Sequence, residues 1–199
     1  MQVQPATTNH FFRHACCFEA ALTPLALGLG WLTNTNPIID LRWTEAALTN
    51  GILATLPMVL LFFALQALPV NALQTIRRLL LETLGSRLHQ RHWADLLVLA
   101  AIAGFSEELL FRGSLQPWLE RLFEPTGGLI VSNLVFALAH AVTPLYAVMA
   151  FLMGLYLGFC LDYGGERNLL TPMVVHGLYD FVAFLVIIRH YRQLTAKTL

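Results

Sequence analysis

The stretch that decides the fold is Gly104-Phe-Ser-Glu-Glu-Leu-Leu-Phe-Arg-Gly113, which sets Glu107, Glu108 and Arg112 inside an apolar run from 94 to about 118. Such a run is long enough for a helix to cross about 30 Å of hydrocarbon. A charged side chain near the bilayer centre costs a few kcal/mol, so such residues face the interior of a helical bundle and often mark a functional site. The segment predicts a transmembrane helix with one polar side.

The whole chain has the composition of a membrane protein. Of its 199 residues, 57% are hydrophobic and 12% are charged, against about 25% charged residues in a typical soluble domain. Lysine plus arginine and aspartate plus glutamate balance at 12 each, so no net charge attracts nucleic acid. We expect an all-α, polytopic transmembrane bundle whose surroundings are the lipid bilayer, with no nucleic-acid partner.

Across the whole chain, the apolar pattern predicts about six transmembrane spans, including 94–118, and one interfacial helix. Segment 71–93 does not cross, because leucine and isoleucine recur every three or four residues while arginines and a glutamate take the other face. A polar N-terminal stretch, residues 1–16, precedes the first span. The predicted spans are 18–33, 51–68, 94–118, 129–142, 144–161 and 171–191, with a polar turn at 124–128. All 199 residues are interpreted as one membrane domain whose motif-bearing core is 94–191.

Two local patterns refine the last spans. Thr171 and Pro172 are typical of an N-cap and a first helical residue, so the sixth span should begin there. In the fifth span, Gly154 and Gly158 form a small-xxx-small pattern, which allows close approach of a neighbouring helix.

The distribution of basic residues predicts the orientation. With the N-terminus inside, the inner loops hold eight basic residues and the outer loops three, which favours a cell (inner) membrane protein with both termini cytoplasmic. The inner set is Arg13, Arg77, Arg78, Arg87, Arg91, Arg189, Arg192 and Lys197, and the outer set is Arg42, Arg121 and Arg167. This orientation puts Glu107 about 20 Å from the inner side, past the midplane. Either the site opens outward, or the arginines of the amphipathic segment make the count of basic residues misleading.

Two further predicted spans carry polar groups where a membrane helix should be apolar. The fourth contains His140, four residues after Phe136, with Asn133 one heptad earlier on the same face. The sixth carries His176 and Asp180 at i, i+4. Polar side chains in a bundle face inward and contact each other. We therefore expect one shared site.

On the decisive helix, Glu108 and Arg112 stand at i, i+4 and form a pair one turn apart. Glu107 lies about 100° round the helix and has no in-register partner on its own helix. We expect Glu107 to face the site as a general base, and Glu108 with Arg112 to support it.

The side-chain inventory permits two hydrolytic schemes. In one, Glu107 deprotonates a water that attacks a peptide carbonyl, and His176 and Asp180 stabilise the developing charge. His140 helps to position or protonate the reacting groups. In the other, Glu107, His140, His176 and Asp180 hold a zinc ion with an open position. Two non-proteolytic interpretations also stand: a non-catalytic immunity or scaffold protein that keeps the cluster as structural glue, and a small proton-coupled transporter.

The chain resembles the CPBP family of membrane proteins in three motifs, in order and spacing: Glu107-Glu108-x-x-x-Arg112, Phe136-x-x-x-His140 and His176-x-x-x-Asp180. That family comprises the type II CAAX prenyl endopeptidases and the bacteriocin-processing or abortive-infection proteins. The resemblance implies an all-helical fold and an intramembrane peptidase, often labelled a metalloendopeptidase. Its substrate would be membrane-anchored: a CAAX-type tail, a leader peptide or a C-terminal anchor.

The same resemblance implies roles for individual residues. The first glutamate of the pair, Glu107, would activate water, and the third motif, His176 with Asp180, would bind the oxyanion. His140 is the second-motif histidine. The third motif often ends in asparagine, and a carboxylate at Asp180 suits a metal site better than an oxyanion hole.

Overall fold

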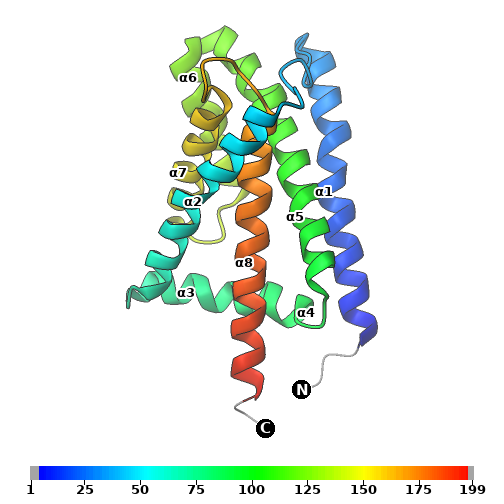
Figure 1. The fold of residues 1–199 in the computed structure, drawn as a ribbon, viewed down its shortest axis with the longest axis vertical. Coiled ribbons are helices and arrows are strands. Elements are labelled where there is room, and N and C mark those ends of the chain that lie inside the picture. The colour runs from blue at the N-terminus through cyan, green and yellow to red at the C-terminus, as the bar shows by residue number, and fades with distance from the viewer. Residues whose placement is uncertain (1–4, 197–199) are drawn as a thin grey trace.

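The computed structural model describes residues 5–196, which form helices joined by short connections and contain no strand (Figure 1). The predicted all-helical class is confirmed. In chain order the elements are α1 (Pro5–Thr33), α2 (Glu45–Ala67), α3 (Asn71–Leu80), the π-helical turn η1 (Leu81–Gly85), α4 (Ser86–Leu88), α5 (Trp93–Glu108), the π-helical segment η2 (Leu109–Leu115), α6 (Gln116–Ala139), α7 (Pro144–Leu161) and α8 (Leu170–Ala196).

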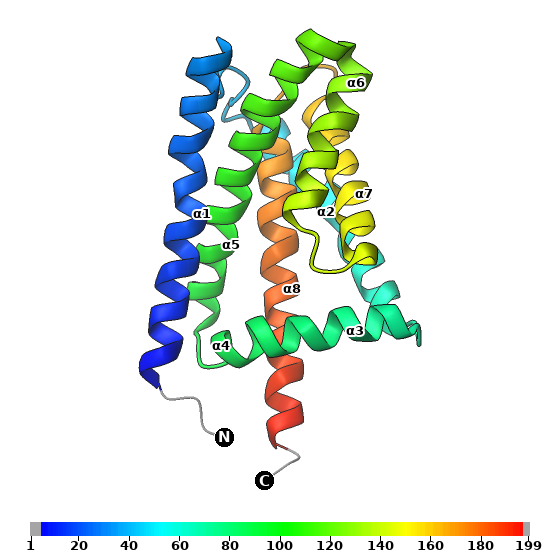
Figure 2. The same cartoon turned by 180° about the vertical axis from the view of Figure 1, so that it is seen from behind.

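Four helices of the described chain are long and apolar enough to cross a membrane. They are His10–Thr33 within α1, then α2, α7 and α8. Of the remaining helices, α5 runs without interruption through η2 into the first half of α6, and the second half of α6 folds back beside them (Figure 2). The chain is a multi-pass membrane protein.

The predicted polar turn at 124–128 is shorter than expected. Only Phe123 and Glu124 leave the helical conformation, with Glu124 at a φ of 60°. From Pro125 the chain is helical again and the second half of α6 folds back, since proline is well suited to a first helical turn. The polar composition of 126–128 misled the prediction.

The first helix begins well before the predicted span 18–33, because residues 5–16 of the polar N-terminal stretch already belong to α1. This part of the helix packs on the interfacial segment: the guanidinium groups of Arg87 and Arg91 lie 4.9 and 4.6 Å from the ring centroids of Phe11 and Phe12. Both rings also pack against the buried cluster around Leu88. Aromatic and cation–π contacts therefore extend the helix beyond its apolar part.

The predicted interfacial helix is confirmed. α3, η1 and α4 lie across the end of the bundle at which both ends of the described chain emerge (Figures 1 and 2). Leu73 and Ile76 are buried while Arg78 is exposed, as an amphipathic helix requires. Tyr191 of α8 packs on Gly85, where an added Cβ would lie 3.0 Å from the tyrosine side chain.

The outer basic residues gather at the opposite end of the bundle, where they tie connections together. Arg121 Nη2 donates to the Thr33 carbonyl at 2.6 Å. Arg167 lies 2.7 Å from Glu120, and this hydrogen bond raises the pKa of Arg167. Lys197, one of the eight inner basic residues, lies outside the described residues. The separation of the two sets fits the predicted common side for both termini.

α8 is the central helix and packs against α5 and α2 (Figure 1). It begins at Leu170, and Asn168 Oδ1 accepts a hydrogen bond from the Leu170 amide at 3.0 Å. The predicted N-cap, Thr171, is therefore already inside the helix. An asparagine two residues before the first helical residue satisfies the free amide instead.

Candidate active site

The crossing of α5 and α8 brings the first and third motifs together. A Cβ on Gly104 would lie 2.7 Å from the Gly177 amide nitrogen and 2.9 Å from the Met173 carbonyl oxygen. Since both contacts are to backbone atoms, only glycine permits this approach. Glu107 and Glu108, one turn beyond Gly104, are thereby set beside α8.

Glu108 is the centre of a buried hydrogen-bond chain. Its Oε1 atom lies 3.1 Å from Arg112 Nη1 and 2.7 Å from His176 Nδ1. The predicted Glu108–Arg112 pair is confirmed. Because the carboxylate oxygen only accepts, the Nδ1–H of His176 donates to it, and this fixes the orientation of the imidazole ring.

Arg112 extends the chain to two further helices. Its Nη2 atom donates to Asn133 Oδ1 at 2.8 Å and to the Gly154 carbonyl at 2.7 Å. Its guanidinium carbon lies 4.8 Å from the centroid of the Phe136 ring. A buried guanidinium is tolerated when its donors are satisfied in this way.

The predicted close approach at Gly154 and Gly158 is confirmed, and the neighbour is α6. A Cβ on Gly154 would overlap Asn133 Oδ1, and one on Gly158 would overlap the Leu129 side chain. The small residue at 154 thus leaves room for the Arg112–Asn133 hydrogen bond.

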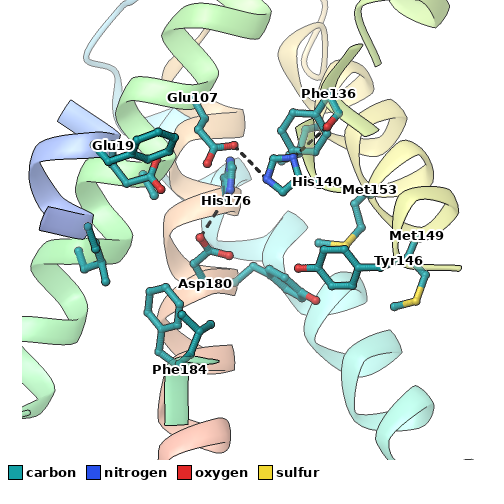
Figure 3. Close-up of a pocket in the computed structure, with 18 of the residues that line it drawn as sticks. Glu19, Glu107, Phe136, His140, Tyr146, Met149, Met153, His176, Asp180 and Phe184 are labelled. Atoms are coloured by element: carbon teal, nitrogen blue, oxygen red, sulfur yellow. Dashed lines mark hydrogen bonds and ion pairs between the residues drawn. The ribbon is translucent and has the colours of Figure 1, made fainter. Parts of the chain in front are cut away.

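Glu107 points away from this chain and into a cavity, opposite His140 (Figure 3). Its Oε2 atom lies 3.5 Å from His140 Nε2. His140 Nδ1 is 2.9 Å from the Phe136 carbonyl, which only accepts, so Nδ1 carries the hydrogen. In the neutral ring, Nε2 then offers its lone pair to the cavity.

His176 and Asp180 form the next wall of the same cavity (Figure 3). His176 Nε2 lies 3.6 Å from Asp180 Oδ2. Glu107, His140, His176 and Asp180 therefore line one space, as the sequence predicts, while Glu108 and Arg112 lie behind it.

The cavity has a volume of about 520 Å³ and reaches beyond the motif residues. His14 of α1 and Leu84 of η1 line it along with Glu107. The space therefore extends from the motif residues towards the end of the bundle that carries the interfacial segment. Most of its remaining lining is apolar, including Phe18, Met149, Met153 and Phe184.

The cavity is also lined by polar side chains that the predicted site lacks, and two of them lie close to its acids. Glu19 of α1 interacts through its carboxyl group with Glu107, and Tyr146 of α7 lines the wall near Asp180 (Figure 3). Glu19 interrupts the first apolar run, which is the only signal in the sequence for its role. Tyr146 has no such signal, because a tyrosine in an apolar helix is common.

The donor atoms do not form a metal-binding set. Among residues 5–196, no group of three or more histidine, cysteine, aspartate or glutamate side chains is arranged to hold a metal ion. The Nδ1 atoms of His176 and His140 are engaged by the Glu108 carboxylate and the Phe136 carbonyl, and the two Nε2 atoms lie towards Asp180 and Glu107. The zinc scheme for Glu107, His140, His176 and Asp180 stays a prediction.

Comparison with known proteins tests the resemblance. Residues 89–182 match the family model described as type II CAAX prenyl endopeptidase Rce1-like. No curated protein and no solved structure matches the chain. The matched segment contains all three motifs, so the part of this membrane protein that builds the site belongs to the Rce1-like family of type II CAAX prenyl endopeptidases.

Proposed function

We propose that the protein is an intramembrane endopeptidase in which Glu107 activates water for the hydrolysis of a membrane-proximal peptide bond. The observation that carries the proposal is the opposition of Glu107 Oε2 and His140 Nε2 across a cavity, at 3.5 Å. Family membership supports a protease, and this geometry supplies the base.

Glu107 and His140 are suited to hold the attacking water beside them, on the cavity side of both atoms. A separation of 3.5 Å is longer than a direct hydrogen bond but leaves a water within reach of both atoms. The carboxylate and the imidazole lone pair both accept, so the water points both hydrogens at the protein and a lone pair at the substrate. The water oxygen bonds to the carbonyl carbon as its proton passes to Glu107.

His176 and Asp180 are suited to the other side of the substrate carbonyl. Glu108 holds His176 through Nδ1, so Nε2–H of the doubly protonated ring is directed at the oxyanion of the tetrahedral intermediate. Asp180, on the same side of the cavity, keeps this ring in place. When the intermediate collapses, the carbon–nitrogen bond breaks and Glu107 returns its proton to the leaving amine.

The proposed substrate is an extended peptide with an apolar anchor, such as a CAAX-type tail. Apart from its charged groups, the cavity is lined by aromatic and methionine side chains such as Phe18 and Met153. Methionine adapts to irregular apolar ligands. Because the cavity extends towards the interfacial segment, where we place the cytoplasmic face, a substrate would reach Glu107 from that side, although the count of basic residues puts Glu107 past the midplane.

The test is hydrolysis in proteoliposomes of a fluorescent peptide that ends in a farnesylated cysteine followed by three residues. The wild type should cleave it, and Glu107→Ala and His176→Ala should each lose about 10²–10⁴-fold in rate. Exposed residues of the same types provide matched controls, Glu82→Ala and His190→Ala, which should cleave like the wild type. Retained cleavage by Glu107→Ala or His176→Ala contradicts the assigned roles. An unmodified peptide shows whether the isoprenoid is needed.

A further inference from the structure

Glu19 is a carboxyl group inside the first membrane span, where an ionisable residue is costly and usually functional. It lies on α1, outside the segment that matches the family model. Its carboxyl group interacts with that of Glu107, and both side chains line the same cavity (Figure 3). α1 therefore places a second carboxyl group, that of Glu19, near the proposed general base Glu107.

The position of Glu19 is fixed by contacts at both ends of α1. Towards the far end, Ser114 Oγ donates to the Ala26 carbonyl at 2.9 Å and Arg121 binds the Thr33 carbonyl. Towards the near end, Phe11 lies under Arg87. Since the helix is held on either side of residue 19, the carboxyl group has little freedom to leave Glu107.

Two carboxyl groups that interact inside one cavity are costly to ionise together, so such a pair shares a proton. Glu107 must be the ionised partner if it is to accept a proton from water. Glu19 is then the neutral acid, with one O–H to donate. Glu107 Oε2 and Glu19 Oε2 both lack a hydrogen-bond partner among the residues that the structure describes, so a proton between the two carboxyl groups adds a hydrogen bond that neither oxygen has.

We propose that Glu19 is a positioning residue for the reaction: its carboxylic acid donates a hydrogen bond to Glu107 and holds that carboxylate towards the water site. This inference rests on the proposed function. It makes α1 part of the active site, although the three motifs and the matched segment lie entirely downstream.

The hydrogen bond can be tested by side chains that keep or remove the donor. A glutamine at position 19 retains an N–H donor of similar reach, whereas an alanine there has none. In the proteoliposome assay with the farnesylated peptide, Glu19→Ala should lower kcat about 10–100-fold with KM changed by less than about twofold. Glu19→Gln should recover most of the lost kcat.

A matched variant separates this role from simple packing. Leu22 is partly buried on the same helix, one turn along, and packs against the core, so Leu22→Ala removes packing without removing a donor. It should lower thermal stability with a much smaller loss in kcat. An equal loss of kcat in Glu19→Ala and Leu22→Ala overturns the proposal. Equally low kcat in Glu19→Gln and Glu19→Ala also overturns it, because a charge would then be what matters.

An infrared measurement without substrate distinguishes failure of this inference from failure of the proposed function. The wild type in detergent should show the C=O absorption of a protonated carboxylic acid, and the Glu19→Gln spectrum should lack that band. If the wild type cleaves no probe but the band behaves as stated, the proposed function fails and the Glu19–Glu107 pair stands. If the two spectra agree in this region, Glu19 is ionised and the pair is refuted.

Discussion

Glu108 Oε1 lies 2.7 Å from His176 Nδ1, which joins the second glutamate of the first motif to the histidine of the third. The same oxygen also receives Arg112 at 3.1 Å. Glu108 is therefore more than a neutralising partner for the arginine. Because Glu108 binds both groups, the buried guanidinium of Arg112 also fixes the place of the His176 imidazole at the cavity.

Removal of Arg112 should unfold the bundle rather than only slow a reaction. Arg112→Leu leaves Glu108 with His176 as its remaining partner, and breaking a buried ion pair costs about 3–5 kcal/mol. Thermal unfolding in detergent should show a large fall in Tm. The double variant Glu108→Gln with Arg112→Leu carries no stranded charge, so its Tm should be higher than that of Arg112→Leu alone. A double variant that is no better than the single one would show that the pair is not the source of the loss.

Replacement of Asp180 by asparagine should preserve much of the activity. The amide keeps the shape of the carboxylate and adds a donor for an oxyanion, so we expect Asp180→Asn to retain at least about a tenth of kcat/KM. Asp180→Leu removes the polar contact between residue 180 and His176, and kcat/KM should fall about 10²–10³-fold. Steady-state kinetics on the farnesylated peptide measures both. Inactive Asp180→Asn would mean that the carboxylate charge itself is required.

The two glycines at the α5–α8 crossing should respond differently to the same change. A Cβ at 104 would lie 2.7 Å from a backbone nitrogen, whereas one at 177 would lie no closer than 3.4 Å from the Ala100 carbonyl. Gly104→Ala should cost about 1–3 kcal/mol and separate Glu107 from His176. Gly177→Ala should be neutral or stabilising, since alanine favours the helix by up to about 1 kcal/mol. Unfolding and peptide cleavage should rank the two variants in this order.

The direction of the cavity can be measured by cysteine labelling on α1. In a background without the three native cysteines, His14→Cys should react with a membrane-impermeant maleimide from the side that carries the N-terminus. Trp31→Cys, exposed near the other end of the helix, should react from the opposite side. Peptide substrate should slow labelling only at 14, because that residue lines the cavity. Labelling of both positions from one side would contradict the placement of α1 across the membrane.

Much of this fold is predictable from the sequence, because the bilayer imposes simple demands. The apolar run 144–161 matches α7, and the periodicity of the amphipathic segment predicts α3 and α4. The convergence of His140 and His176 follows from the rule that polar groups in a membrane bundle face one another.

The features that the sequence does not predict depend on local packing and conformation, which the pattern of residue types does not determine. Nothing in the sequence fixes how α1 is rotated against α5, so the contact between Glu19 and Glu107 needs the packed structure. A standard helical wheel does not describe η2 either, because the turn of a π-helix is wider than that of an α-helix and changes which residues share a face. A short polar string such as 124–128 cannot by itself distinguish a loop from a helix start.

The buried chain through Arg112 also constrains how the molecule is made. Its charged members lie on one helix, but their partners Asn133, Gly154 and His176 come from α6, α7 and α8, which leave the ribosome later. Until the last helix is inserted, Glu108 lacks its histidine and the cavity lacks a wall. A chain that ends before α8 therefore lacks both the histidine partner of Glu108 and one wall of the cavity, so the proposed site is complete only when the last helix is in place.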